Sequence, residues 1–219
     1  MAWRNDQVSE AETQKIIELA RSALLLEGDY VELGCYKGDT SLLLADIIFS
    51  GPRPAGPSPR AAGANSRAAA LRNAQKKQYS ANGHRLFIYD SFEGLPEKTD
   101  LDASEAGKDF TAGALAVSKR EVKERFLRAG LPVPVIKKAW FSELSEDDLP
   151  EKIAFAFLDG DLYESIRDSL KLVEGKMVTG GVIIVHDYNN PALPGVAKAV
   201  DEWRDNRDLQ VFKSLAIIK

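Results

Sequence analysis

The feature that most constrains the fold of this chain is a regular alternation of short β-rich runs with helical stretches. The runs are apolar on both faces, so each needs cover on both sides, and a helical connection joins parallel strands. We therefore expect a doubly wound α/β domain with a mostly parallel, seven-stranded-type sheet and helices on both faces. The expected strands are 29–33, 85–89, 134–138, 153–158 and 181–186, and the expected helices are 9–26, 38–49, 118–129, 162–174 and 195–206.

The length of 219 residues, with 44% hydrophobic residues, is enough for one domain spanning 1–219. The last segment, 209–219, is again strand-like. Residues 51–82 interrupt the alternation with four prolines, six basic residues and no acid. This composition predicts an inserted, solvated Pro/Ala-rich loop, or alternatively a basic flap that receives an anionic substrate.

Charge and cysteine content narrow the range of partners and locations. A net charge of -4 gives no reason to expect nucleic acid or an anionic membrane as the main partner. The first ten residues carry no apolar leader, and no apolar run is long enough for a membrane span. Cys35 is the only cysteine, so we expect no internal disulfide and a cytoplasmic location.

A glycine-rich turn, VELGCYKGDTS (31–41), follows the first expected strand. Such a turn indicates close approach of a ligand to the backbone. The spacing of Gly34 and Gly38 departs from the dinucleotide fingerprint, and no P-loop motif is present, so a nicotinamide dehydrogenase is a distant alternative. Glu32, just before the turn, would repel a pyrophosphate and favour a cationic ligand.

An acid also ends the second expected strand, in LFIYDSFEGLP (86–96). Asp90 stands where α/β domains place an acid that accepts hydrogen bonds from ribose hydroxyls, and a turn residue is an equal alternative when Asp90 is taken alone. Together with Glu32 it favours a nucleoside with a positive charge, and S-adenosylmethionine is such a ligand. Trp140 and Phe141, after the third strand, are candidates to stack on its adenine.

Several longer strings then point to a family. In order, VELGCYKGDTS, YDSFEGLP, FLDGDLYES, GGVIIVHDY and PGVAKAVDEW resemble the macrocin O-methyltransferase family over 29–203, apart from 51–82. The resemblance implies a Rossmann-like class I methyltransferase fold, S-adenosylmethionine as the donor, a divalent cation, usually magnesium, and a hydroxyl acceptor on a sugar or natural product. The candidate cofactor residues are Glu32, Gly34, Tyr36, Gly38, Thr40, Ser41, Asp90, Ser91, Trp140, Phe141 and Asp159.

The resemblance also implies roles for the acids that end the fourth and fifth strands. Asp159 and Asp187 fall on family metal ligands, and Asp161 on the proposed general base. The family usually has Asp-Asp-Tyr where this chain has His186-Asp187-Tyr188, which makes His186 the third candidate ligand and leaves magnesium or manganese open. A hydrogen-bonded histidine that binds no metal remains the alternative for His186, and a helix N-cap for Asp161.

The acids also carry an argument of their own. Residues i and i+2 of an extended chain point the same way, so Asp159 and Asp161 would converge with Asp187 from the neighbouring strand. Adjacent like charges raise at least one pKa, and a divalent cation bound by carboxylates relieves the repulsion. Tyr163 and Tyr188 are expected either in the acceptor pocket or in the core.

The expected activity is methyl transfer to a small-molecule hydroxyl with metal assistance. Alternatives are a metal-independent O- or N-methyltransferase, with His186 or Asp161 acting on an acidic hydroxyl or an amine, and a non-catalytic cofactor-binding protein. The amino-terminal region looks short for the family, so we expect acceptor-covering elements either to be missing or to be replaced by 51–82 and 97–117. Further copies of the chain, in a homo-oligomer, are an open alternative as partners.

Overall fold

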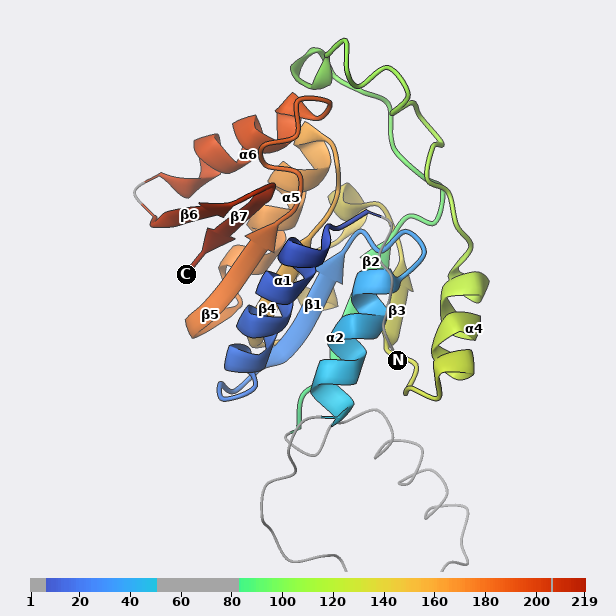
Figure 1. The fold of residues 1–219 in the computed structure, drawn as a ribbon, viewed down its shortest axis with the longest axis vertical. Helices are drawn as coiled ribbons and strands as arrows, with labels where there is room; N and C mark the ends of the chain where they lie inside the picture. Colours follow the sequence, from blue (N-terminus) through green and yellow to red (C-terminus); the bar gives the residue numbers. More distant parts are fainter. Residues whose placement is uncertain (1–6, 51–82, 206) are drawn as a thin grey trace, which may run out of the picture.

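The computed structural model describes residues 7–50, 83–205 and 207–219 (Figure 1). The basic segment expected as an insertion, 51–82, lies outside the described residues, and its two interpretations stay predictions. In the part of the chain that is described, no helix has the length and apolar character needed to cross a membrane.

A single seven-stranded sheet organises these residues, in the order β3-β2-β1-β4-β5-β7-β6. β1 to β5 are parallel, and β7 pairs antiparallel with both β5 and β6. The strands are β1 (Asp29–Leu33), β2 (Leu86–Asp90), β3 (Val135–Lys138), β4 (Ile153–Leu158), β5 (Met177–Val185), β6 (Leu209–Phe212) and β7 (Leu215–Ile218). The expected doubly wound, mostly parallel sheet is confirmed.

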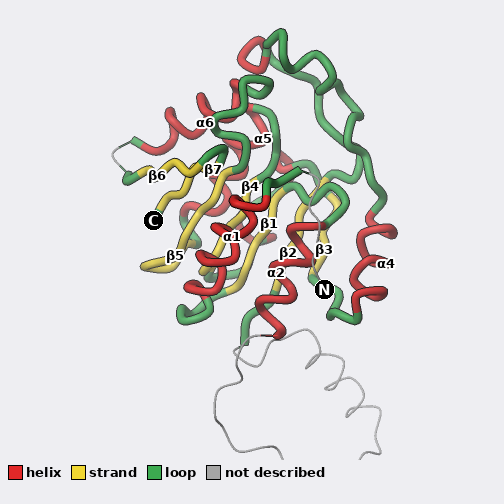
Figure 2. The backbone as a smooth tube through the Cα atoms, in the orientation of Figure 1, coloured by secondary structure: helices red, strands yellow, loops and turns green. Residues whose placement is uncertain are grey.

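Helices cover both faces of this sheet, and Figure 2 shows α1 and α2 on the near face. One core cluster joins α1, α2 and α4 to the sheet, and a second joins α5 and α6 to its other face. The helices are α1 (Glu10–Ala23), α2 (Asp39–Ser50), α4 (Lys119–Ala129), α5 (Tyr163–Glu174) and α6 (Pro194–Arg204), with short 3₁₀ turns η1 (Asp100–Asp102), η2 (Phe141–Glu143) and η3 (Glu146–Asp148).

The two core clusters follow from the alternation of side chains along each strand. In β4, Phe155 and Phe157 belong to the cluster under α1 and α2, whereas Ala156 and Leu158 belong to the cluster under α5 and α6. All of β4 is buried. This two-sided burial is why its sequence is continuously apolar instead of alternating.

Several boundaries differ from the sequence expectation: α1 ends at Ala23 instead of residue 26, α6 ends at Arg204 instead of residue 206, and two strand regions differ further. The segment 209–219 is a hairpin of two antiparallel strands, because Lys213 adopts a left-handed φ of 55° between them. β5 begins at Met177, four residues before the apolar run starts at Gly181, because Met177 still pairs with Ile153 of β4; the register then shifts before Val182 pairs with Phe155. None of these changes moves the carboxyl ends of β1, β2, β4 and β5, where ligands bind in open α/β sheets.

Candidate active site

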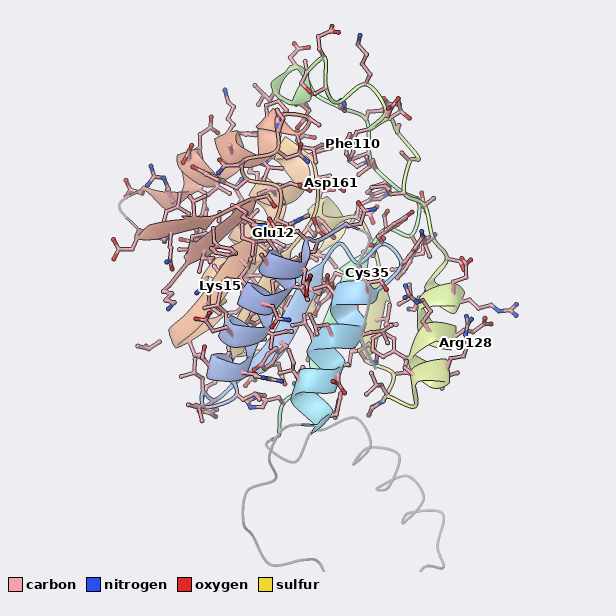
Figure 3. The ribbon with its side chains drawn as sticks, viewed as in Figure 1. Glu12, Lys15, Cys35, Phe110, Arg128 and Asp161 are labelled. Carbon is pink, nitrogen blue, oxygen red and sulfur yellow. The ribbon has the colours of Figure 1, made fainter. Side chains whose placement is uncertain are left out.

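A pocket opens at the carboxyl ends of β1, β2 and β4 and beside the end of β5. This is the edge at which open α/β sheets bind their ligands. In Figure 3 the labelled Asp161 lies toward this upper end of the molecule, as Phe110 does. The lining residues include Gln7, Gly34, Tyr36, Asp90, Ser91, Leu95, Pro96, Leu115, Trp140, Phe141, Asp159, Asp161, Ser165, His186 and Asp187.

Unusual backbone conformations gather around this pocket. Four of its lining residues other than glycine have positive φ: Tyr36 (44°), Leu115 (63°), Asp161 (61°) and Asp187 (60°). Residues held in the left-handed region persist only where the surrounding structure determines them, and they are common at functional sites. The backbone is therefore shaped here to aim side chains into the pocket.

The centre of the pocket is formed by His186 and two carboxylates. The imidazole Nδ1 of His186 lies 3.0 Å from Asp159 Oδ1 and 3.1 Å from Asp187 Oδ2. Burial by itself would lower the pKa of His186, but the carboxylates of Asp159 and Asp187 raise it to about 11. The imidazolium thus balances the two acids.

The same three side chains fit a divalent ion. One ligand atom from each of Asp159, His186 and Asp187 lies within 4.8 Å of the others. Neighbouring ligands of an octahedral ion at ~2.1 Å are about 3.0 Å apart, close to the separations around Nδ1. One imidazole and two carboxylates suit manganese or another transition ion better than magnesium. An ion there would take the place of the imidazole proton.

Asp161 reaches the pocket by another route than the one expected. β4 ends at Leu158, and the left-handed conformation of Asp161 turns its side chain inward, so the residues 159 to 161 are not an extended strand. Burial, with the charges of Asp159 and Asp187, holds the pKa of Asp161 well above its usual range. Asp161 is not a helix cap, because Leu162 is the N-cap residue of α5.

Gly34 and Asp90 shape the half of the pocket next to β1 and β2. A Cβ on Gly34, whose φ is +89°, would lie 2.0 Å from the backbone oxygen of Asp159, so only glycine fits between the two strand ends. Asp90 accepts hydrogen bonds from the backbone N–H of Cys35 at 2.8 Å and of Phe92 at 2.7 Å. Each carboxylate oxygen keeps a further lone pair for a ligand hydroxyl.

Other candidate cofactor residues lie behind the pocket wall: Glu32, Gly38, Thr40 and Ser41 are buried and do not line it. Glu32 is 1% exposed, accepts a hydrogen bond from Ser41, and has its pKa raised to about 8 by burial. Glu32, expected to face a cationic ligand, does not line the pocket in this structure. The alternation of β1 turns Glu32 toward α2, away from the pocket.

Of the aromatic candidates, some line the pocket and others lie outside it. Trp140 and Phe141 line the pocket, as expected for residues that follow β3. Tyr163 and Tyr188 do not; their hydroxyls donate to Glu202 and Asp201 of α6. Sequence reasoning did not single out the lining residues Leu95, Pro96, Leu115, Ser165 and Gln7, although Leu95 and Pro96 end the string YDSFEGLP.

A seven-stranded sheet with antiparallel β7 and a pocket at the carboxyl ends of its parallel strands defines a class I methyltransferase fold. Solved structures share it: the O-methyltransferase NovP, with a TM-score of 0.70 and 23% identity, covers 98% of this chain and 82% of its own. The calicheamicin methyltransferase CalS11 matches with a TM-score of 0.68 and 19% identity, over 99% of this chain and 80% of its own.

The sequence comparison is more specific. The family model for macrocin-O-methyltransferase (TylF) matches residues 66–215, and the chain belongs to this family. Curated relatives include a rhamnosyl-tetracenomycin-C 4'-O-methyltransferase of Streptomyces olivaceus, 28% identical over 81% of this chain and 58% of its own. Another is the demethyldecarbamoylnovobiocin O-methyltransferase of Streptomyces niveus, 26% identical over 83% of this chain and 60% of its own. The chain thus spans less than two thirds of their length.

Proposed function

We propose that this protein transfers a methyl group from S-adenosylmethionine to a hydroxyl of a glycosylated natural product, with a divalent ion bound at Asp159, His186 and Asp187. The observation that carries the proposal is the meeting of this cluster with Asp161 and the Gly34 turn in one pocket. Membership of the macrocin O-methyltransferase family supports it. The acceptor class is supported by two relatives, the rhamnosyl-tetracenomycin-C enzyme and a mycinamicin III 3''-O-methyltransferase of Micromonospora griseorubida, which is 28% identical over 61% of this chain and 54% of its own.

The cofactor would occupy the half of the pocket built on β1, β2 and the end of β3. Asp90 would accept hydrogen bonds from ribose hydroxyls, and the narrow approach at Gly34 would let the ligand lie against the backbone. Trp140 and Phe141 would stack on the adenine. These contacts direct the reactive end of the donor toward the acids at the end of β4.

When bound, S-adenosylmethionine supplies an electrophilic methyl group, and a divalent ion lowers the pKa of a hydroxyl that it contacts. Asp159, Asp187 and His186 Nδ1 would hold the ion, and the carboxylate of Asp161 would accept the hydroxyl proton. Burial raises the pKa of Asp161, which makes its carboxylate a stronger base than an exposed one. The chain otherwise contributes orientation of the two reactants.

A metal-independent methyltransferase is the second candidate. It is favoured by one observation: His186, with its pKa raised to about 11, already balances the charges of Asp159 and Asp187. In that case Asp161 would act on a hydroxyl that is itself acidic, or on an amine.

Methyl transfer after chelation, with single metals added back, separates the two candidates. Suitable acceptors are mycinamicin III, demethyldecarbamoylnovobiocin and TDP-rhamnose. These compounds appear in the names of two relatives and of the solved CalS11 structure. The proposal expects activity to disappear in chelator and return with one divalent ion. Full activity in chelator would establish the metal-independent candidate, and tight calorimetric binding of NAD without any binding of S-adenosylmethionine would contradict both.

A further inference from the structure

The segment from Pro96 to Leu115, here called the rim segment, stands at the mouth of the pocket. Both of its end residues line the pocket. Its base is closed by two backbone hydrogen bonds of 2.9 Å, from Leu95 N to Ala114 O and from Gly113 N to Leu95 O. Figure 1 shows the segment, in green, projecting above the sheet next to the start of α6. Its placement therefore decides how wide the pocket mouth is.

One buried carboxylate holds this segment, most of whose residues are exposed or half-buried. Asp102 is 1% exposed. Its Oδ2 accepts hydrogen bonds from Thr99 N at 3.1 Å and Thr99 Oγ1 at 2.8 Å, and so closes the turn of η1. Its Oδ1 accepts from the backbone N–H of Tyr163, the first residue of α5, at 2.7 Å. A buried acid on a surface turn needs such partners, and here they come from two elements.

The contact with Tyr163 supplies a cap that α5 lacks. The N-cap residue of α5, Leu162, makes no side-chain hydrogen bond to the helix. The first N–H groups of a helix have no partner within it, and they carry partial positive charge. Asp102 therefore caps α5 from 61 residues away along the chain. This also explains why the neighbouring Asp161 is free to point into the pocket.

The same carboxylate lies against α6. A Cβ built on Gly195, in the first turn of α6, would meet Asp102 Oδ1 at 2.0 Å. Glycine at this position is what lets the acid reach the two helix starts. A second contact reinforces the arrangement: Ser104 Oγ donates to the backbone oxygen of Ala192 at 2.9 Å, just before α6.

These contacts connect the rim segment to the reacting groups. α5 starts two residues after Asp161, and the turn that leads to α6 starts at His186, next to Asp187. We propose that Asp102 is a positioning residue: it locks the rim segment onto the starts of α5 and α6, and thereby sets the acceptor side of the pocket relative to Asp161 and Asp187. The expected effect of Asp102 on acceptor binding rests on the proposed methyl transfer. The locking of the rim segment does not.

Limited trypsin digestion followed by mass spectrometry tests the locking without any acceptor. Asp102→Ala removes the carboxylate, and Gly195→Ala displaces it by steric overlap. Both variants should be cleaved about tenfold faster than the parent at Lys98 and Lys108 in the rim segment, with cleavage at Lys137 on β3 unchanged. Asp100→Ala, an exposed acid of the same turn, is the matched control. Unchanged cleavage in both variants would overturn the proposal.

Two comparisons separate locking from general destabilisation. Because both substitutions break one contact, the double variant should be cleaved no faster than either single variant, within about twofold; additive acceleration would contradict a shared contact. Asp102→Asn keeps an oxygen for Tyr163 N and loses one acceptor for Thr99, so its cleavage rate should fall between those of the parent and Asp102→Ala. A rate for Asp102→Asn equal to that of Asp102→Ala would also count against the proposal.

Kinetics with mycinamicin III as the probe acceptor then test the consequence. Loosening the rim segment should raise the KM for the acceptor about tenfold, while calorimetric Kd for S-adenosylmethionine stays within about threefold. If Asp102 only stabilised the fold, Asp102→Ala would change the KM for the acceptor and the Kd for S-adenosylmethionine together. If the parent protein methylates no acceptor, the proposed function fails, and the digestion experiment still decides whether Asp102 locks the rim segment.

Discussion

His186 Nδ1 lies 3.0 Å from Asp159 Oδ1 and 3.1 Å from Asp187 Oδ2, so a single imidazole nitrogen bridges the two acids. His186 is 4% exposed, and the neighbouring charges hold it as an imidazolium in this geometry. The proton on Nδ1 and a divalent ion compete for the same place. Loss of that proton should therefore accompany metal binding, and affinity should rise with pH.

The identity of the residue at 186 should set metal preference. His186→Asp exchanges an imidazole for a hard anionic oxygen, and it should shift the preference from manganese toward magnesium by about tenfold. The measurement is calorimetric titration of each ion into the parent and the variant. Asp147→Asn, an exposed acid of η3, serves as the control for a changed net charge. An unchanged preference would show that His186 is not a ligand.

Removing the proposed base should separate chemistry from metal binding. Asp161→Asn preserves shape but cannot take a proton at neutral pH, so kcat should fall by about 10²–10⁴-fold, while the metal Kd stays within about threefold. Rates and calorimetry on the same preparation check this. A variant that loses the metal as well would identify Asp161 as a ligand, and full turnover would remove it from the mechanism.

Asp90 should carry a large share of cofactor affinity. Asp90→Ala deletes the acceptor for ribose hydroxyls and the tie to Cys35 N, and hydrogen bonds to a charged group are worth about 1.5–3 kcal/mol each. The Kd for S-adenosylmethionine should rise by about 10–100-fold. The exposed neighbour Glu93→Ala is the matched control. Equal Kd values for the two variants would place the ribose elsewhere.

Glu32 should make the stability of the ligand-free protein depend on pH. Burial raises its pKa from 4.5 to about 8, so the folded state prefers the protonated acid. The stabilisation from this group is fully present below pH 4.5 and is lost as pH rises through about 8. Above that range the buried carboxylate is charged and weakens the fold.

Glu32→Gln, which mimics the protonated acid, should remove this dependence. The difference in melting temperature between Glu32→Gln and the parent should therefore depend on pH. It should favour the variant by several degrees more at about pH 9 than at about pH 5. Thermal melts of the parent, Glu32→Gln and the exposed control Glu97→Gln across this range provide the comparison. Parallel curves for the parent and Glu32→Gln would show that Glu32 titrates normally in the fold.

Much of the fold could be predicted from the sequence, because it depends on local patterns. β4 is apolar on both faces, and a strand of that kind must lie inside a parallel sheet. Once the strand order follows, the ends of β4 and β5 must be neighbours, which is why Asp159, His186 and Asp187 were expected together. Sequence motifs also placed Gly34 and Asp90 at the strand ends that border the pocket.

The tertiary structure decided what depends on side-chain direction and on contacts between distant residues. Glu32 and Asp90 both looked like ligand contacts, but the pleat of β1 turns Glu32 toward α2, whereas Asp90, at the end of β2, lines the pocket. The left-handed backbone of Asp161 and the bridging position of His186 depend on packing around them, which no local pattern encodes. Asp102 is the clearest case. It looks like any exposed-loop acid in the sequence, and only the fold brings it to the start of α5, because capping in trans depends on long-range packing.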